Sequence, residues 1–120
     1  MSDEEQHPFS GFLPESMNVL KRTADGRAIV EVYGNGLGDT AKTGSHLVLK
    51  EEHVLVNGGL YLFFNGRFNS YMYRRVRFVD AKTVELVSEG DYDDTFRLQW
   101  PDDEGGWEVL ARVDKILKSV

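Results

Sequence analysis

The stretch LYLFFNG at residues 60–66 decides how this chain folds. Five apolar residues in succession are typical of a buried strand, and the Asn65-Gly66 pair that follows is the strongest hairpin signal in the chain. Residues 67–79 continue with aromatic side chains that favour a long return strand. We therefore predict an antiparallel hairpin near the middle of the chain.

Further strand-like segments lie on both sides of this hairpin, and no amphipathic helix separates them. Glycine-rich turns divide the segments, as at Asp25-Gly26 and residues 101–106. The pattern predicts a mostly β chain that forms one domain, a barrel or a sandwich. We expect residues 1–16 to be a flexible or loosely docked arm and residues 17–120 to be the domain. The other predicted strands span residues 18–23, 28–33, 46–49, 83–87, 95–100 and 107–117.

Composition narrows the functional classes. The chain has 120 residues, a formal net charge of −6 and no cysteine. The negative charge disfavours direct binding to nucleic acid, and no apolar run approaches the ~20 residues that a membrane span requires. Without cysteine there is neither a disulfide framework nor a thiolate metal site. These features are typical of a cytoplasmic protein, and the acidic residues 1–6 do not resemble a secretory leader.

From about Ala28 onward, the chain carries a series of short motifs: GNGL (34–37), GSHLVL (44–49), NGGLY (57–61), YRRV (73–76), VELVSEGDY (84–92) and VLARV (109–113). The chain resembles the C-terminal domain of the LexA-type self-cleaving peptidases, which include the LexA repressor, the phage repressors and UmuD. The resemblance implies a LexA-type fold, in which small twisted β-sheets form a partly open barrel and the C-terminal part mediates dimerisation.

The family's catalytic serine and lysine are both absent. Gly36 stands at the serine position and has no hydroxyl, whereas Arg74 stands at the lysine position and stays protonated, so it cannot act as a base. Ser45 and Thr40 are nearby hydroxyls, but both fit ordinary turn positions. The resemblance thus implies a protein without the family's peptidase reaction, and no cofactor is expected.

Alternation along residues 67–79 assigns side chains to two faces. One face carries Arg74 inward, where a buried guanidinium needs a carboxylate partner, and Asp39 is our candidate. The other face carries aromatic and basic side chains that are typical of binding hot spots, although an ordinary strand surface explains them equally well. These residues are Tyr71, Tyr73, Arg75 and Arg77.

Four apolar residues near the C-terminus form a second candidate interface. The resemblance places self-association here, and exposed tryptophan and leucine side chains would form an apolar patch. Core packing explains the same residues equally well, and both alternatives stay open at this point. The residues are Trp100, Trp107, Leu110 and Val113.

No metal site is predicted. The acidic run at residues 91–94 lacks the glycine and the terminal glutamate of a calcium loop, which favours a solvated turn. The three histidines, His7, His46 and His53, do not have the spacing of a zinc site.

The function that these observations favour is binding. We expect a dimerising regulator or antirepressor that acts on a LexA-type or phage-repressor-type partner, as a homodimer or as a heterodimer with a related repressor. The setting would be transcription regulation, such as the SOS response. The alternatives are a UmuD-like polymerase accessory and a hydrolase with a rebuilt active site.

Overall fold

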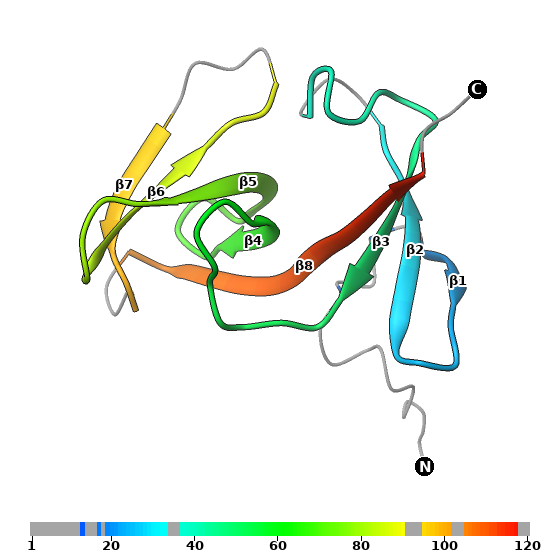
Figure 1. Ribbon diagram of the computed structural model, residues 1–120, viewed down its shortest axis with the longest axis horizontal. Coiled ribbons are helices and arrows are strands. Elements are labelled where there is room, and N and C mark those ends of the chain that lie inside the picture. Colours follow the sequence, from blue (N-terminus) through cyan, green and yellow to red (C-terminus); the bar gives the residue numbers. More distant parts are fainter. Residues whose placement is uncertain are drawn as a thin grey trace.

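The computed structural model describes residues 13, 17, 19–33, 37–90, 95–101 and 105–117. These residues form strands and contain no helix (Figure 1). The prediction of a mostly β chain is therefore confirmed, with strands close to their predicted positions. The strands are β1 (Val19–Arg22), β2 (Arg27–Glu31), β3 (His46–Lys50), β4 (Leu60–Asn65), β5 (Ser70–Phe78), β6 (Thr83–Val87), β7 (Thr95–Gln99) and β8 (Trp107–Leu117).

The strands join a single antiparallel sheet in the order β1-β2-β3-β8-β4-β5-β6-β7. Among the described residues the sheet is not closed, because β1 and β7 each have one neighbour and do not pair with each other. This differs from the several small sheets that we expected. Figure 1 shows β8 running across the molecule between the β1–β3 half and the β5–β7 half.

The central strand β4 is buried on both faces. Leu60 and Leu62 join one group of core residues, whereas Tyr61 and Phe63 join another. Because successive side chains of a strand point to opposite faces, the two groups lie on opposite sides of the sheet. The unbroken apolar run at residues 60–64 therefore reflects a strand that supports two cores.

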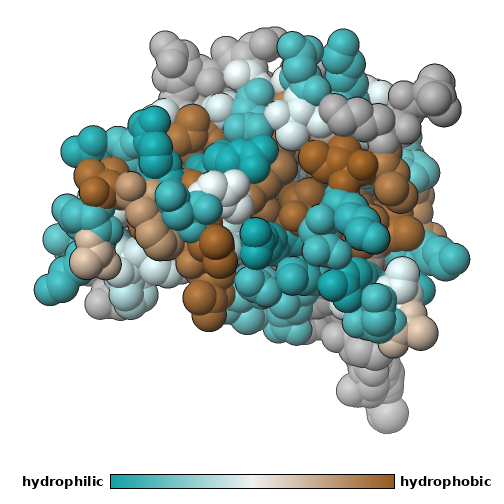
Figure 2. All heavy atoms as spheres, in the orientation of Figure 1, coloured by the Kyte–Doolittle hydropathy of each residue, from teal (hydrophilic) through white to brown (hydrophobic). Residues whose placement is uncertain are grey.

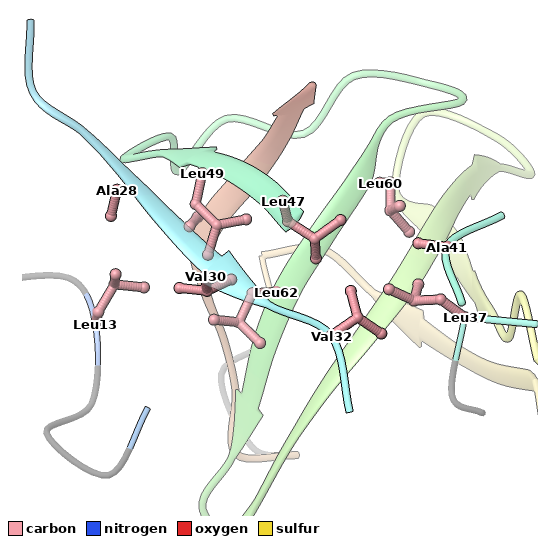
Figure 3. Packing of buried hydrophobic residues seen from close by; sticks show 11 residues of the cluster. Leu13, Ala28, Val30, Val32, Leu37, Ala41, Leu47, Leu49, Leu60 and Leu62 are labelled. Atoms are coloured by element: carbon pink, nitrogen blue, oxygen red, sulfur yellow. The ribbon is translucent and has the colours of Figure 1, made fainter. Parts of the chain in front are cut away.

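The first core, cluster 1, lies against the β1–β3 half of the sheet (Figure 3). Ala28 and Val30 of β2 pack here with Leu47 and Leu49 of β3, all of them at most 2% exposed. Leu37 joins them from the loop between β2 and β3. Cluster 1 therefore ties the described part of that loop to the sheet.

The second core, cluster 2, fills the β5–β7 half. Phe63 is its centre: the ring centroid of Trp107 lies 6.1 Å away and that of Trp100 6.4 Å away, both in edge-to-face geometry. Phe96 and Leu98 of β7 pack against the same group. Both tryptophans are partly buried and pack against this core.

Strand β8 serves both cores because it contains two bulges. Leu110 is an extra residue between Val109 and Ala111, which pair with consecutive residues of β4. Val109 consequently faces cluster 2, whereas Ala111 faces cluster 1. Asp114 is a second extra residue, opposite β3.

Candidate functional site

The structure places Arg74 inside the fold, as predicted, but on the opposite side of the sheet from the described part of the β2–β3 loop (residues 32–45). Arg74 is 7% exposed; it donates a hydrogen bond of 2.8 Å to the carbonyl of Tyr73, and its guanidinium lies 5.9 Å from the ring centroid of Phe96 in cluster 2. Leu37, in contrast, packs in cluster 1. Gly36, the other position of the lost dyad, lies outside the described residues.

The next arginine, Arg75, is linked to the loop through Glu89. Glu89 accepts a hydrogen bond from the Thr40 hydroxyl at 2.7 Å and another from Arg75 at 2.8 Å. Arg75 also donates to the carbonyl of Gly58 at 2.9 Å. The Arg75 guanidinium lowers the pKa of Glu89, so this carboxylate is a weak base and is poorly suited to activating the Thr40 hydroxyl.

Asp39 does not supply the buried partner predicted for Arg74. Its side chain is fully exposed, and its carboxylate lies 3.8 Å from the ammonium of Lys42. Ser45 is 2% exposed, and its backbone connects the loop through hydrogen bonds with Val32 and Lys42. The described part of the loop is thus held as a structural turn.

The aromatic and basic face predicted on β5 is only partly exposed. Tyr71 is 44% exposed and stacks near Phe64, with ring centroids 4.7 Å apart. Tyr73 instead packs against cluster 1, and this burial raises the pKa of its hydroxyl. The expectation of one continuous exposed face was wrong at this residue, because the sheet is covered on both sides here. Arg75 and Arg77 form ion pairs with Glu89 and Glu85.

The four residues of the predicted C-terminal patch are partly buried. Leu110 and Val113 pack against cluster 1, while Trp100 and Trp107 pack in cluster 2. These four residues lie on opposite sides of the sheet and do not form one surface.

An open groove lies on the outer face of β2, β3 and the C-terminal half of β8. Its volume is about 680 Å³. Ile29 and Val48 pair across β2 and β3 and form its apolar floor together with Leu117, which is 48% exposed. Figure 2 shows apolar side chains gathered over this part of the sheet and bordered by polar ones.

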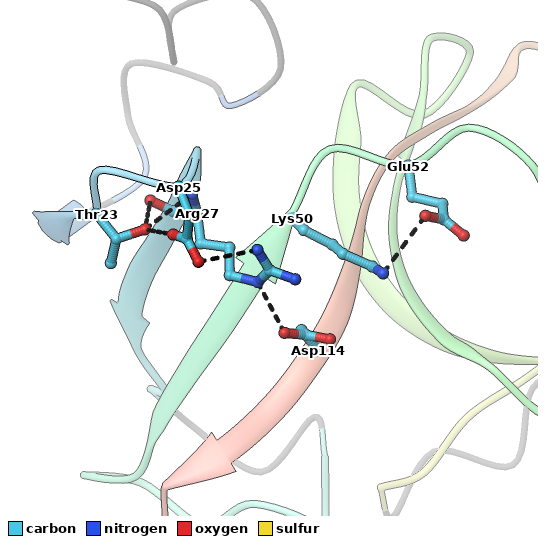
Figure 4. Close-up of polar contacts among 6 residues, drawn as sticks. All are labelled: Thr23, Asp25, Arg27, Lys50, Glu52 and Asp114. Atoms are coloured by element: carbon cyan, nitrogen blue, oxygen red, sulfur yellow. Dashed lines mark hydrogen bonds and ion pairs between the residues drawn. The ribbon is translucent and has the colours of Figure 1, made fainter.

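Polar side chains form one wall of the groove (Figure 4). The Arg27 guanidinium donates to Asp114 at 2.8 Å and also contacts Asp25 at 3.1 Å. These contacts raise the pKa of Arg27 and lower that of Asp114. Lys115 lines the groove beside Asp114. The groove thus combines an apolar floor with ordered charges, as protein-binding surfaces do.

Sequence reasoning missed this groove, although one signal was present. Residues 47–49 are all apolar, so one of them has to face away from cluster 1. That residue is Val48. The contribution of Asp114 was hidden, because nothing in the sequence marks it as a bulge.

Comparison with known proteins does not identify the chain: no family model matches it, and no curated protein matches it. Among the described residues, no group of three or more histidine and acidic side chains is placed to hold a metal ion. The same part of the chain contains no helix long and apolar enough to cross a membrane.

Proposed function

We propose that this protein is a non-catalytic interaction module that forms dimers and regulates a LexA-type or phage-repressor-type partner. One observation carries the proposal: the C-terminal half of β8 lines an open groove with an apolar floor. The motif resemblance assigns self-association to the same end of the domain. The groove and the motif resemblance therefore both favour the surface around the C-terminal half of β8 as the site of self-association.

The groove has the properties that a second protein surface would use. Leu117 is 48% exposed, although it lies beside the nearly buried Val48. Covering the exposed part of this side chain would be favourable by about 25 cal/mol for each Å² of apolar surface removed from water. The fixed Arg27–Asp114 pair would add orientation to this contact.

The absence of a peptidase reaction is part of the proposal. Arg74 carries a guanidinium where the family has the lysine amine that serves as base, and it faces cluster 2 rather than the loop. Thr40 contacts a carboxylate that is stabilised in its charged form. We therefore expect that a serine-directed fluorophosphonate probe does not label the protein. Labelling at Thr40 or Ser45 would support a hydrolase with a rebuilt site instead.

Sedimentation equilibrium of the full chain tests the dimer. Leu117→Asp should weaken self-association strongly, because a carboxylate would be placed against the floor of the groove. Val54→Asp is the matched control, since Val54 is 73% exposed and does not line the groove. Circular dichroism should show that both variants are folded.

The two variants separate the possible outcomes. A dimer that is lost in Leu117→Asp and kept in Val54→Asp supports the proposal. A monomer at all concentrations that still captures a helix-turn-helix repressor, but loses it in Leu117→Asp, supports the heterodimer. Equal behaviour of the two variants in both assays overturns the proposal, and capture of a DNA polymerase in place of a repressor favours the accessory role.

A further inference from the structure

Strand β7 forms the edge of the sheet opposite the groove. Figure 1 shows it at the margin of the molecule, and its one neighbour in the sheet is β6. Its residues alternate regularly: Phe96 and Leu98 face cluster 2, whereas Thr95, Arg97 and Gln99 are exposed. An edge strand of this kind presents backbone groups that can pair with another strand.

The outer face of this edge carries a ladder of charges. Arg77 of β5, Glu85 of β6 and Arg97 of β7 are directly opposite one another in the sheet. Arg77 donates to one oxygen of Glu85 at 2.8 Å, and Arg97 donates to the other at 2.7 Å. The Glu85 side chain is 10% exposed, whereas each arginine is 64% exposed.

This ladder is unbalanced at the edge. One carboxylate is shared by two guanidinium groups, so the outermost charge, on Arg97, is positive and still largely accessible to water. Opposite charges on directly opposed positions stabilise neighbouring strands. The position opposite Arg97 on an added strand therefore favours Asp or Glu.

The inner face of the edge favours apolar neighbours. Phe96 lies 5.0 Å from Trp107 and 6.2 Å from Phe68 between ring centroids, and Phe68 is 59% exposed. Apolar side chains on an added strand, placed beside Phe96 and Leu98, would continue this aromatic surface.

The other edge of the sheet is less suited to strand addition. Strand β1 pairs irregularly with β2 through a bulge near Val19, and it carries the exposed charges of Lys21 and Arg22. Bulges protect an edge from pairing, and β1 combines its bulge with two adjacent charged residues, whereas β7 has no bulge and one charged residue. Strand β7 pairs with β6 over all five of its residues without a bulge.

We propose that β7 binds an extended segment of a partner protein as an added strand, with an acidic residue opposite Arg97 and apolar residues on either side of it. The chain already contains such a segment on the other side of β7, namely Val84, Glu85 and Leu86 in β6. A second copy of β7 is a poor partner, because antiparallel pairing centred on Arg97 would bring two arginines together.

A labelled peptide with the sequence of residues 82–88 (KTVELVS) is the probe, and the full-length protein is the receptor. Fluorescence polarisation measures binding, and amide chemical shifts of residues 95–99 locate it. The matched control peptide carries Glu85→Lys and should bind about fivefold more weakly, which corresponds to about 1 kcal/mol for one cross-strand charge pair. A Leu86→Pro peptide should lose binding as well, because proline cannot donate to a strand ladder.

Variants of the receptor complete the test. Arg97→Glu should reverse the preference, so that the lysine peptide binds better than the glutamate peptide. Arg97→Gln should bind the glutamate and lysine peptides equally. Because it removes the charge without reversing it, this variant still tests the proposal if Arg97→Glu does not fold. Lys21→Glu, a charge reversal on the other edge, should leave the preference unchanged.

The inference is independent of the groove, so Leu117→Asp should not alter peptide binding. Three results would overturn it: no binding at millimolar peptide, equal binding of the glutamate and lysine peptides, or shift changes that map to β1 rather than to residues 95–99.

Discussion

The guanidinium of Arg27 on β2 donates a 2.8 Å hydrogen bond to the carboxylate of Asp114 on β8, across the intervening strand β3. Asp114 is the extra residue of a bulge, and its side chain and that of the following Lys115 both line the groove. The Arg27–Asp114 contact joins the two strands that border the proposed dimer groove. The stability of this wall should therefore depend on pH.

The pH dependence follows from the pKa of Asp114, which Arg27 lowers. A carboxyl group with a lowered pKa stabilises the fold above its unfolded pKa of about 3.9, and this contribution is lost as the pH falls through the folded value. The free energies of unfolding of the native protein and Asp114→Asn should therefore differ at pH 7 and converge below about pH 4. Urea unfolding measures this. In an Arg27→Met background the difference should disappear, and a difference that persists in strong acid would contradict the assignment.

Gly38 should be the least replaceable of the described loop residues. It has φ of +54°, and a Cβ placed on it would lie well inside the contact distance of the Glu89 backbone oxygen. Gly26 is a matched control, because its φ is +88° and its Cβ would meet nothing within 4 Å. Gly26→Ala should cost about 1 kcal/mol from backbone strain alone. Gly38→Ala should cost clearly more, because the turn at Glu89 has to move; equal losses in thermal unfolding would disprove this contact.

Hydrophobic pattern and turn residues were enough to predict the strands of this fold. The apolar run and the turn residues after it specify the central hairpin locally, although Asn65 still pairs with Ser70, so the loop spans residues 66–69 and its left-handed residue is Asn69 rather than Gly66. The bulges at Leu110 and Asp114 are different, because they depend on how β8 fits between two strands that are distant in sequence. Strict alternation fails beyond each bulge, so surface and core assignments near the C-terminus were the part that sequence could not provide.

The same reasoning explains the outcome at the candidate sites. Tyr73 was assigned to an exposed face, because a strand in a two-layer fold has one free side. In this sheet both sides of β4 and β5 carry a core, so Tyr73 packs into cluster 1. The edge position of β7 is also a property of the sheet order, which follows from contacts between distant segments and not from the sequence of β7 itself.

His53 should make the stability of the protein fall as the pH rises above neutrality. Its ring nitrogens lie 3.0 Å from the carbonyl oxygen of Val109 and 2.9 Å from the carboxylate of Glu51. Both neighbours are acceptors, so the doubly protonated ring satisfies both contacts, and the Glu51 hydrogen bond raises the pKa of His53. A raised pKa stabilises the fold below the unfolded value of about 6.5, and this contribution is lost as the pH rises through the folded value.

The variant His53→Gln tests this directly. Measured by thermal unfolding, the native protein should lose stability relative to His53→Gln between about pH 6 and pH 8, because only the native protein releases this proton. Glu51→Gln should shift the transition to lower pH, since it removes the charge that favours the protonated ring. A native protein whose profile runs parallel to that of His53→Gln across this interval would refute the role of His53.

The two cores should unfold together, because β4 belongs to both. Trp100 and Trp107, the two tryptophans of the chain, report on cluster 2, whereas circular dichroism reports on the whole sheet. Leu62→Ala removes a side chain that is 1% exposed from cluster 1, and it should cost about 2–5 kcal/mol. If β4 couples the clusters, tryptophan fluorescence and circular dichroism will shift to lower urea by the same amount. A fluorescence transition that stays in place while circular dichroism shifts would show two independently folding halves.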